Sequence, residues 1–143
     1  MTIKFYKTNG PHGYMSNYYK ARFYYNGRWW NTVEHPYQAG KCVVPVEYDL
    51  IWNTVKANDA RLLGQKVQLR TDWDVAKDII MYECVLAKFL QHPNLRAQLL
   101  ETGDEELIED SSVDYYWGCG KDGTGKNMLG KVTMQIRSQL HGE

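Results

Sequence analysis

The chain has 143 residues, 24% of them charged, and its 17 basic side chains balance 17 acidic ones. Balanced charge argues against a protein held on nucleic acid mainly by counterion release, but it leaves binding of a single nucleotide or a flipped base open. The three cysteines are widely spaced without a CxxC pair, which argues against a disulfide framework or a zinc site. With no apolar leader and no run as long as a membrane span, we expect a soluble cytoplasmic protein of one domain, residues 1–143, without metal or cofactor.

The predicted elements mix a few short strands with several helices. Asn26-Gly27 predicts a hairpin turn because both residues tolerate positive φ. Thr32 is expected to cap a helix that begins at Val33, and Thr71 or Asp72 to cap the longest helix. The other predicted elements are strands at 3–6, 22–25 and 107–110 and helices at 45–56, 58–66, 74–91, 94–102 and 127–140. The order is not a βαβ alternation, so the sequence predicts an α+β fold, mostly helical with a small antiparallel sheet.

The segment VEHPYQAGK, residues 33–41, carries a carboxylate, an imidazole, a carboxamide and an ammonium. On a helix with about 100° per residue, Glu34, Gln38 and Lys41 fall within an arc of roughly 60°. This polar stripe is either a solvated face or a reaction surface on a helix that lines a pocket, and its position after the aromatic hairpin favours the second. His35 is more typical of a packed, hydrogen-bonded histidine than of a catalyst, and the segment lacks the ligands of a metal site.

A second candidate region is DYYWGCGKDGTGKN, residues 114–127. Its GxxxxGK match lacks the Ser or Thr that a P-loop requires, because Asn127 stands there, so a P-loop NTPase is excluded. The glycines before the last helix either leave backbone N–H groups for a phosphate or form a plain turn. Asp114 and Trp117 pair a carboxylate with a stacking surface, which suits a sugar–base substrate and also an ordinary loop anchor. In GYMSNYY, residues 13–19, Asn17 either holds a ligand or makes an Asx turn.

Four segments match, in order, the motifs of one known family. GYMSNYY is similar to its G-x-x-S-N-F/Y motif, and TVEHPYQAGK to its S/T-V-E-H-x-Y-Q-x-x-K helix. TDWDVAKDIIMYECVLAKF resembles its W-D…M…A…K-F helix, and DYYWGCGKDGTGKNMLGKVTM its D-x-x-W-G-x-G…G-x-N-x-L-G-x-x-x-M ending. The family is the NADAR, or YbiA-like, superfamily of N-glycosidases, and the resemblance runs from about Phe5 to Leu140.

The resemblance implies an α+β domain that cleaves the N-glycosidic bond of ribosides. One substrate class comprises phosphoribosylamino-pyrimidine intermediates of riboflavin synthesis. The other is ADP-ribose attached to guanine in nucleic acid. The partner is then a phosphoribosyl or ADP-ribosyl small molecule, or a modified nucleic acid, and not a membrane. A non-catalytic ADP-ribose or nucleotide-binding module is the rival from another class.

The family pattern implies a set of site residues. The expected catalytic residues are Glu34, Lys41 and Asp114, and the expected substrate-binding residues are Asn17, Gln38, Trp73, Trp117, Gly118 and Asn127. A pure binding module has no need of all three catalytic groups, which speaks against that rival. Gln65 stands where many members have Arg, so the sequence does not identify the phosphate contacts.

Breaking a C1–N bond requires stabilised positive charge at C1, a protonated leaving nitrogen and a nucleophile. Glu34 and Asp114 are the candidates for the first two tasks. A glycosylamine can also open to an imine, which an amine captures by exchange. We therefore expect Lys41 to form a transient Schiff base with C1, provided that burial lowers its pKa.

Overall fold

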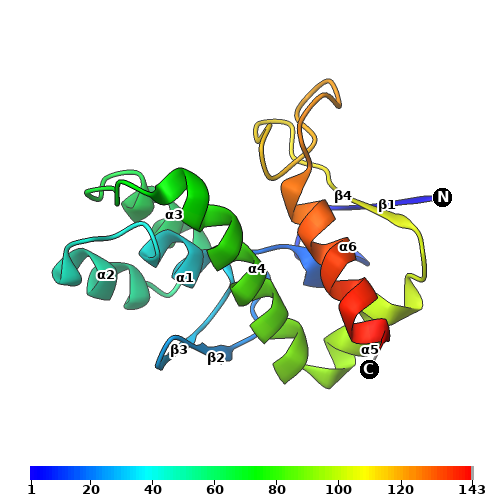
Figure 1. The fold of residues 1–143 in the computed structure, drawn as a ribbon, viewed down its shortest axis with the longest axis horizontal. Coiled ribbons are helices and arrows are strands. Elements are labelled where there is room, and N and C mark those ends of the chain that lie inside the picture. The colour runs from blue at the N-terminus through cyan, green and yellow to red at the C-terminus, as the bar shows by residue number, and fades with distance from the viewer. Residues whose placement is uncertain (143) are drawn as a thin grey trace. The chain divides into compact units, whose positions relative to one another are not determined.

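The computed structural model describes residues 1–142, which divide into two compact units. One unit comprises residues 1–19 with the chain from His92 onward, and the other comprises residues 20–91. The first contains β1 (Thr2–Phe5), the 3-10 helix η1 (Gly13–Met15), α5 (Pro93–Glu101), β4 (Glu106–Glu109) and α6 (Met128–His141) (Figure 1). The second contains β2 (Phe23–Tyr25), β3 (Arg28–Trp30), α1 (Glu34–Ala39), α2 (Pro45–Trp52), α3 (Ala57–Gly64) and α4 (Trp73–Gln91). The predicted α+β class is confirmed.

In the first unit, β1 pairs in parallel with β4, with Phe5 opposite Glu109. Helix α6 packs against β4, and α5 packs against α6 (Figure 1). Phe5, Leu107 and Leu129 are buried in this unit's core. The parallel pairing was not expected, because parallel strands far apart in sequence leave no local turn signal.

The second unit is built around the short helix α1. The antiparallel hairpin β2–β3 turns at Asn26 and Gly27, whose φ angles of 53° and 81° confirm the predicted turn. Helix α1 packs against α2, α3 and α4, and α4 also packs against β2. As a result, all six residues of α1 are buried, although its sequence is largely polar.

The boundaries of α1 differ from the prediction. The helix begins at Glu34, one residue later than expected, and Val33 at its N-cap makes no side-chain cap bond. The backbone N–H of His35 donates to the hydroxyl of Thr32 over 3.4 Å, which is the bond expected of the predicted cap, and the same hydroxyl lies 2.7 Å from the ring Nδ1 of His35. The helix ends at Ala39, so Lys41 lies beyond it and a single helical arc does not describe the three polar residues.

Candidate active site

Glu34 is a buried carboxylate, with 6% of its surface exposed. Burying a charge is unfavourable unless hydrogen bonds compensate it. Gln38 Nε2 supplies one such bond, donating to Glu34 Oε2 over 2.7 Å, one helical turn away. The interpretation of the polar stripe as a solvated face is therefore wrong.

Gln38 is confined by the last residue of α3. A β-carbon on Gly64 would overlap the carboxamide oxygen of Gln38, so a glycine at position 64 leaves room for the Gln38 carboxamide where it lies. That oxygen is buried and accepts no hydrogen bond from the residues that the structure describes. The sequence analysis missed Gly64. A glycine inside a helical pattern is the available signal, because glycine disfavours a helix by about 1 kcal/mol and its presence indicates close packing.

Lys41 lies just after α1, beside two aromatic rings. Its Nζ is 6.0 Å from the ring centroid of Tyr37 and 5.9 Å from that of Trp73. The two rings contact each other, with centroids 5.3 Å apart at 53°. Burial lowers the pKa of Lys41, while the negative charge of Glu34 opposes that shift. The amine is thus easier to deprotonate than an exposed lysine, which a nucleophilic amine requires.

The backbone that carries Lys41 is held by Arg70. The Arg70 N–H donates to the Lys41 carbonyl over 2.9 Å, and the guanidinium Nη1 donates to the Gly40 carbonyl over 3.3 Å. The same guanidinium makes two hydrogen bonds to the Asp72 carboxylate, of 2.6 and 3.0 Å. Arg70 therefore links the end of α1 to the start of α4. Neither Arg70 nor Tyr37 was singled out from the sequence.

His35 is packed and hydrogen-bonded, as predicted. Its ring lies between the Thr32 hydroxyl and the Thr54 carbonyl, which is 3.0 Å from Nε2. A carbonyl only accepts, so Nε2 carries a proton and, in the neutral ring, Nδ1 accepts from Thr32. Burial lowers the pKa of His35, which favours this neutral form.

Asp114 belongs to the first unit and anchors its loop. Its Oδ1 accepts hydrogen bonds from the backbone N–H groups of Tyr116 and Trp117, over 2.9 and 2.7 Å. Its own N–H donates to Ser111 Oγ over 3.1 Å. Within residues 1–142, Oδ2 accepts no hydrogen bond, so one oxygen holds the loop and the other remains available to a ligand.

The glycine-rich loop does not offer free N–H groups to a phosphate at the start of α6. Five consecutive N–H groups, of residues 125–129, donate to loop carbonyls. Asn127, with φ of 53°, uses its side chain to join the loop to β4, accepting from Glu109 N and donating to Leu107 O, both over 2.9 Å. Gly118 is buried, and a β-carbon there would lie 2.8 Å from Ser111 Cβ. Of the two interpretations of these glycines, the structure favours the turn at residues 125–129, because the loop itself accepts these N–H groups.

The predicted site residues fall into two groups, one in each unit. The second unit brings together Glu34, Gln38, Lys41 and Trp73. In the first unit, Asp114, Trp117, Gly118 and Asn127 share one loop, and Asn17 is buried just after η1. Trp117 packs edge-on against Tyr116, with centroids 4.9 Å apart. Trp73 and Trp117 are each only 8% exposed, so each also contributes to the core.

Neither a metal cluster nor a membrane span is found in the described part of the chain. No group of three or more His, Cys, Asp or Glu side chains there is placed to hold a metal ion. No helix within residues 1–142 has the length and apolar character that crossing a membrane requires.

The chain is similar to known proteins over nearly its whole length. Residues 4–141 match the NADAR domain family. An N-glycosidase of Nostoc punctiforme is 43% identical over 145 residues, covering 98% of this chain and 93% of that protein. A riboflavin biosynthesis protein of Vibrio vulnificus is 37% identical over 140 residues, covering 96% of this chain but 38% of that longer protein. The NMR structure of the Escherichia coli protein YbiA superimposes with a TM-score of 0.92 at 36% identity, covering 99% of this chain and 85% of that one. The chain therefore belongs to the NADAR domain family and is an N-glycosyl hydrolase.

Proposed function

We propose that this enzyme hydrolyses the C1–N bond of ribosylamino compounds, and that its substrate is a phosphoribosylamino-pyrimidine intermediate of riboflavin biosynthesis. The observation that carries the proposal is the position of Lys41, half-buried against Tyr37 and Trp73 and coupled to the buried carboxylate of Glu34. A relative named as a riboflavin biosynthesis protein supports the substrate class.

Lys41 acts as the nucleophile in this proposal. The glycosylamine opens to an imine, and the Nζ lone pair of the neutral lysine forms a bond to C1. Two protons move in turn from Nζ to the nitrogen of the leaving base, the C1–N bond breaks as the base leaves as a free amine, and C1 remains attached to Lys41 as an imine. Water then adds to C1 and breaks the bond to Nζ. The products are the free amino-pyrimidine and the sugar phosphate, and Lys41 is regenerated.

Glu34 and Asp114 move the protons. Gln38 fixes Glu34 Oε2 over 2.7 Å, which orients the carboxylate on the buried helix that leads to Lys41. Asp114 Oδ2 accepts no hydrogen bond from the described residues, so it can accept or return a proton while Oδ1 keeps the loop in place. Positioned carboxylates of this kind typically contribute about 10²–10⁴-fold to a rate.

The remaining predicted residues bind the substrate. Trp73 and Trp117 offer ring surfaces for the base or the ribose, and stacking on such surfaces is favourable. Asn17 and Gln38 contribute polar groups, and Gly118 and Asn127 shape the loop that carries Asp114 and Trp117. Since residues 125–129 use their N–H groups internally, side chains rather than these N–H groups contact the phosphate.

The direct test is release of ribose 5-phosphate from a phosphoribosylamino-pyrimidine by the purified protein. We expect release by the native protein, none by Glu34→Gln, and unchanged release by Lys66→Arg, a control at an exposed lysine. No release from the folded native protein would contradict the assigned substrate. Guanine carrying ADP-ribose would then be tested under the same conditions, and tight product binding without turnover on either substrate would identify a binding module.

A further inference from the structure

A groove in the second unit is lined by none of the residues assigned to catalysis. It has a volume of about 560 Å³ and is lined by Arg22, Gly27, Arg28, Trp29, Asp49, Trp52 and Asn53. These residues come from the β2–β3 hairpin and its approach, and from the end of α2. The proposed reaction gives none of them a role.

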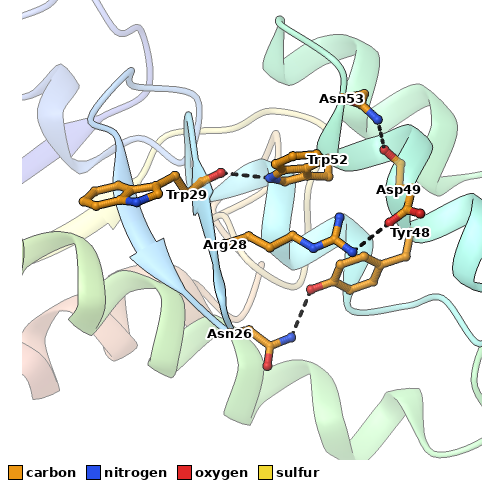
Figure 2. Close-up of polar contacts among 7 residues, drawn as sticks. All are labelled: Asn26, Arg28, Trp29, Tyr48, Asp49, Trp52 and Asn53. Carbon is orange, nitrogen blue, oxygen red and sulfur yellow. Dashed lines mark hydrogen bonds and ion pairs between the residues drawn. The ribbon is translucent and has the colours of Figure 1, made fainter.

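Two tryptophans on this groove are exposed to solvent. Trp29 is 48% exposed and Trp52 is 38% exposed, whereas the other three tryptophans of the chain are at most 8% exposed. The Trp52 ring is held in place, because its Nε1–H donates to the Trp29 carbonyl over 2.9 Å (Figure 2). Exposed indole rings are unfavourable in water, and two of them on one groove are typical of a binding surface.

The groove also carries an oriented guanidinium. Arg28 lies over two rings, its Cζ 4.9 Å from the Tyr48 centroid and 4.8 Å from that of Trp52, and it pairs with Asp49 over 2.8 Å (Figure 2). Within residues 1–142, Asp49 is its only polar side-chain partner, so most of its five N–H donors remain available. The Tyr48 hydroxyl that borders it accepts from Asn26 over 3.0 Å.

A second arginine adds positive charge at the Trp29 side. The Cζ of Arg22 lies 5.2 Å from the Trp29 ring centroid. Two guanidinium groups and one carboxylate, that of Asp49, therefore line the groove, which is locally cationic in a protein with no net charge. A cationic groove with stacking faces fits an anion that carries a flat ring.

We propose that this groove binds single-stranded nucleic acid, with a base stacked on Trp29 or Trp52 and an adjacent phosphate on Arg28. A strand is favoured over a free nucleotide because six of the seven lining residues are exposed, which lets a chain enter and leave the groove at its ends. An acidic peptide would satisfy Arg28 but would leave both indole faces without a flat partner. The binding needs no turnover, so it extends beyond the proposed N-glycosidase reaction.

The test uses the full-length protein and a fluorescein-labelled oligothymidylate of about ten nucleotides, within the ~4–16 nucleotides that single binding folds cover. Fluorescence anisotropy at several salt concentrations gives the dissociation constant. We expect Trp29→Ala and Trp52→Ala each to weaken binding by roughly five- to a hundredfold, the loss typical of one stacked base. Arg28→Met should make the binding constant less dependent on salt, by the amount that about one phosphate contact contributes to the slope. Tyr6→Ala, which removes an equally exposed ring in the first unit, should change nothing.

Several results would overturn this proposal. The native protein could fail to bind the oligonucleotide, or the three groove variants could bind it as tightly as the native protein does. Thymidine monophosphate could also bind as tightly as the oligonucleotide. Competition by an acidic peptide at equal concentration would instead assign the groove to a protein partner. Melting temperatures of all variants identify any loss that reflects unfolding. Loss of binding with ribose 5-phosphate release intact would separate the groove from the catalytic site.

Discussion

Gly64 lies against the carboxamide of Gln38, and a β-carbon at position 64 would overlap the carboxamide oxygen. The same carboxamide donates to Glu34 Oε2 over 2.7 Å. The packing of α3 against α1 thus determines where Gln38 lies, and Gln38 determines where one oxygen of Glu34 lies. A residue without a side chain thereby influences a carboxylate that it does not touch.

Replacing Gly64 by alanine should therefore impair both stability and activity. We expect a loss of about 1–3 kcal/mol in the free energy of unfolding, as for overpacked sites, and a fall of about tenfold to a hundredfold in kcat, as for a displaced catalytic group. Denaturant unfolding and ribose 5-phosphate release measure the two effects. Gly142→Ala is the matched control, because a β-carbon there would make only an ordinary contact at 3.6 Å.

The double variant Gly64→Ala with Gln38→Ala identifies the route of this effect. If Gly64 acts through Gln38, the double variant should be no less active than Gln38→Ala alone, since the overlapping side chain is gone. Additive losses in kcat would show that Gly64 affects the site by another path.

Lys41 should be trapped by borohydride when substrate is present. Reduction of the imine would leave a stable mass increase on Lys41, and Lys41→Arg, which keeps the charge but is never neutral at working pH, should lose both the adduct and the activity. An active enzyme that gives no adduct would rule out the covalent route.

The pH dependence of the reaction should shift when Glu34 is neutralised. The charge of Glu34 raises the pKa of Lys41 and opposes the lowering by burial. Removing that charge in Glu34→Gln lowers the Lys41 pKa further, so the neutral amine should appear at lower pH than in the native protein. NMR titration of labelled lysine reports this pKa without substrate. A shift to higher pH would contradict the coupling of the two side chains.

Asp114→Asn and Asp114→Ala should separate the two uses of this carboxylate. Asparagine keeps an oxygen for the N–H groups of Tyr116 and Trp117, so the melting temperature should stay near the native value while kcat falls about 10²–10⁴-fold. Alanine removes both hydrogen bonds and should also lower stability, by about 1–3 kcal/mol. Full activity in the asparagine variant would leave Asp114 as a loop anchor only.

The elements with strong local signals were predicted well from the sequence. The Asn26-Gly27 turn, the long helix ending at Gln91 and the following helix at 94–102 are found within a residue or two, because turn and helix-end chemistry is local. The polar residues of α1 were correctly interpreted as other than a solvated face, since their position after an aromatic hairpin is visible in the sequence.

What depends on partners far along the chain was not predictable. The parallel pairing of β1 with β4 and the overlap between Gly64 and Gln38 arise only when distant segments meet. The two interpretations of the glycine-rich loop, a phosphate contact or a plain turn, could not be separated for a related reason. A run of glycines does not reveal that carbonyls of the preceding residues already accept the N–H groups of residues 125–129. The roles of the individual site residues in catalysis remain predictions.

The stability of the protein should rise with pH just above neutrality because of Lys88. This side chain is 1% exposed, and burial lowers its pKa from 10.5 to about 7. Above pH 7 the unfolded chain carries a proton on Lys88 that the folded chain has lost, so the free energy of unfolding increases with pH. Between pH 7 and 8.5 we expect the free energy of unfolding to increase by about 1–2 kcal/mol. Lys88→Met should abolish this increase in urea unfolding, and an unchanged slope would show that Lys88 keeps its proton.

A consequence of the β1–β4 pairing concerns the order in which the protein matures on the ribosome. The first strand cannot find its partner until residues 106–109 have been synthesised and have left the exit tunnel. By then the whole of residues 20–91, with the buried helix α1, is already outside. The segment that carries Lys41 can thus reach its native structure during translation, before the segment that carries Asp114 has left the tunnel.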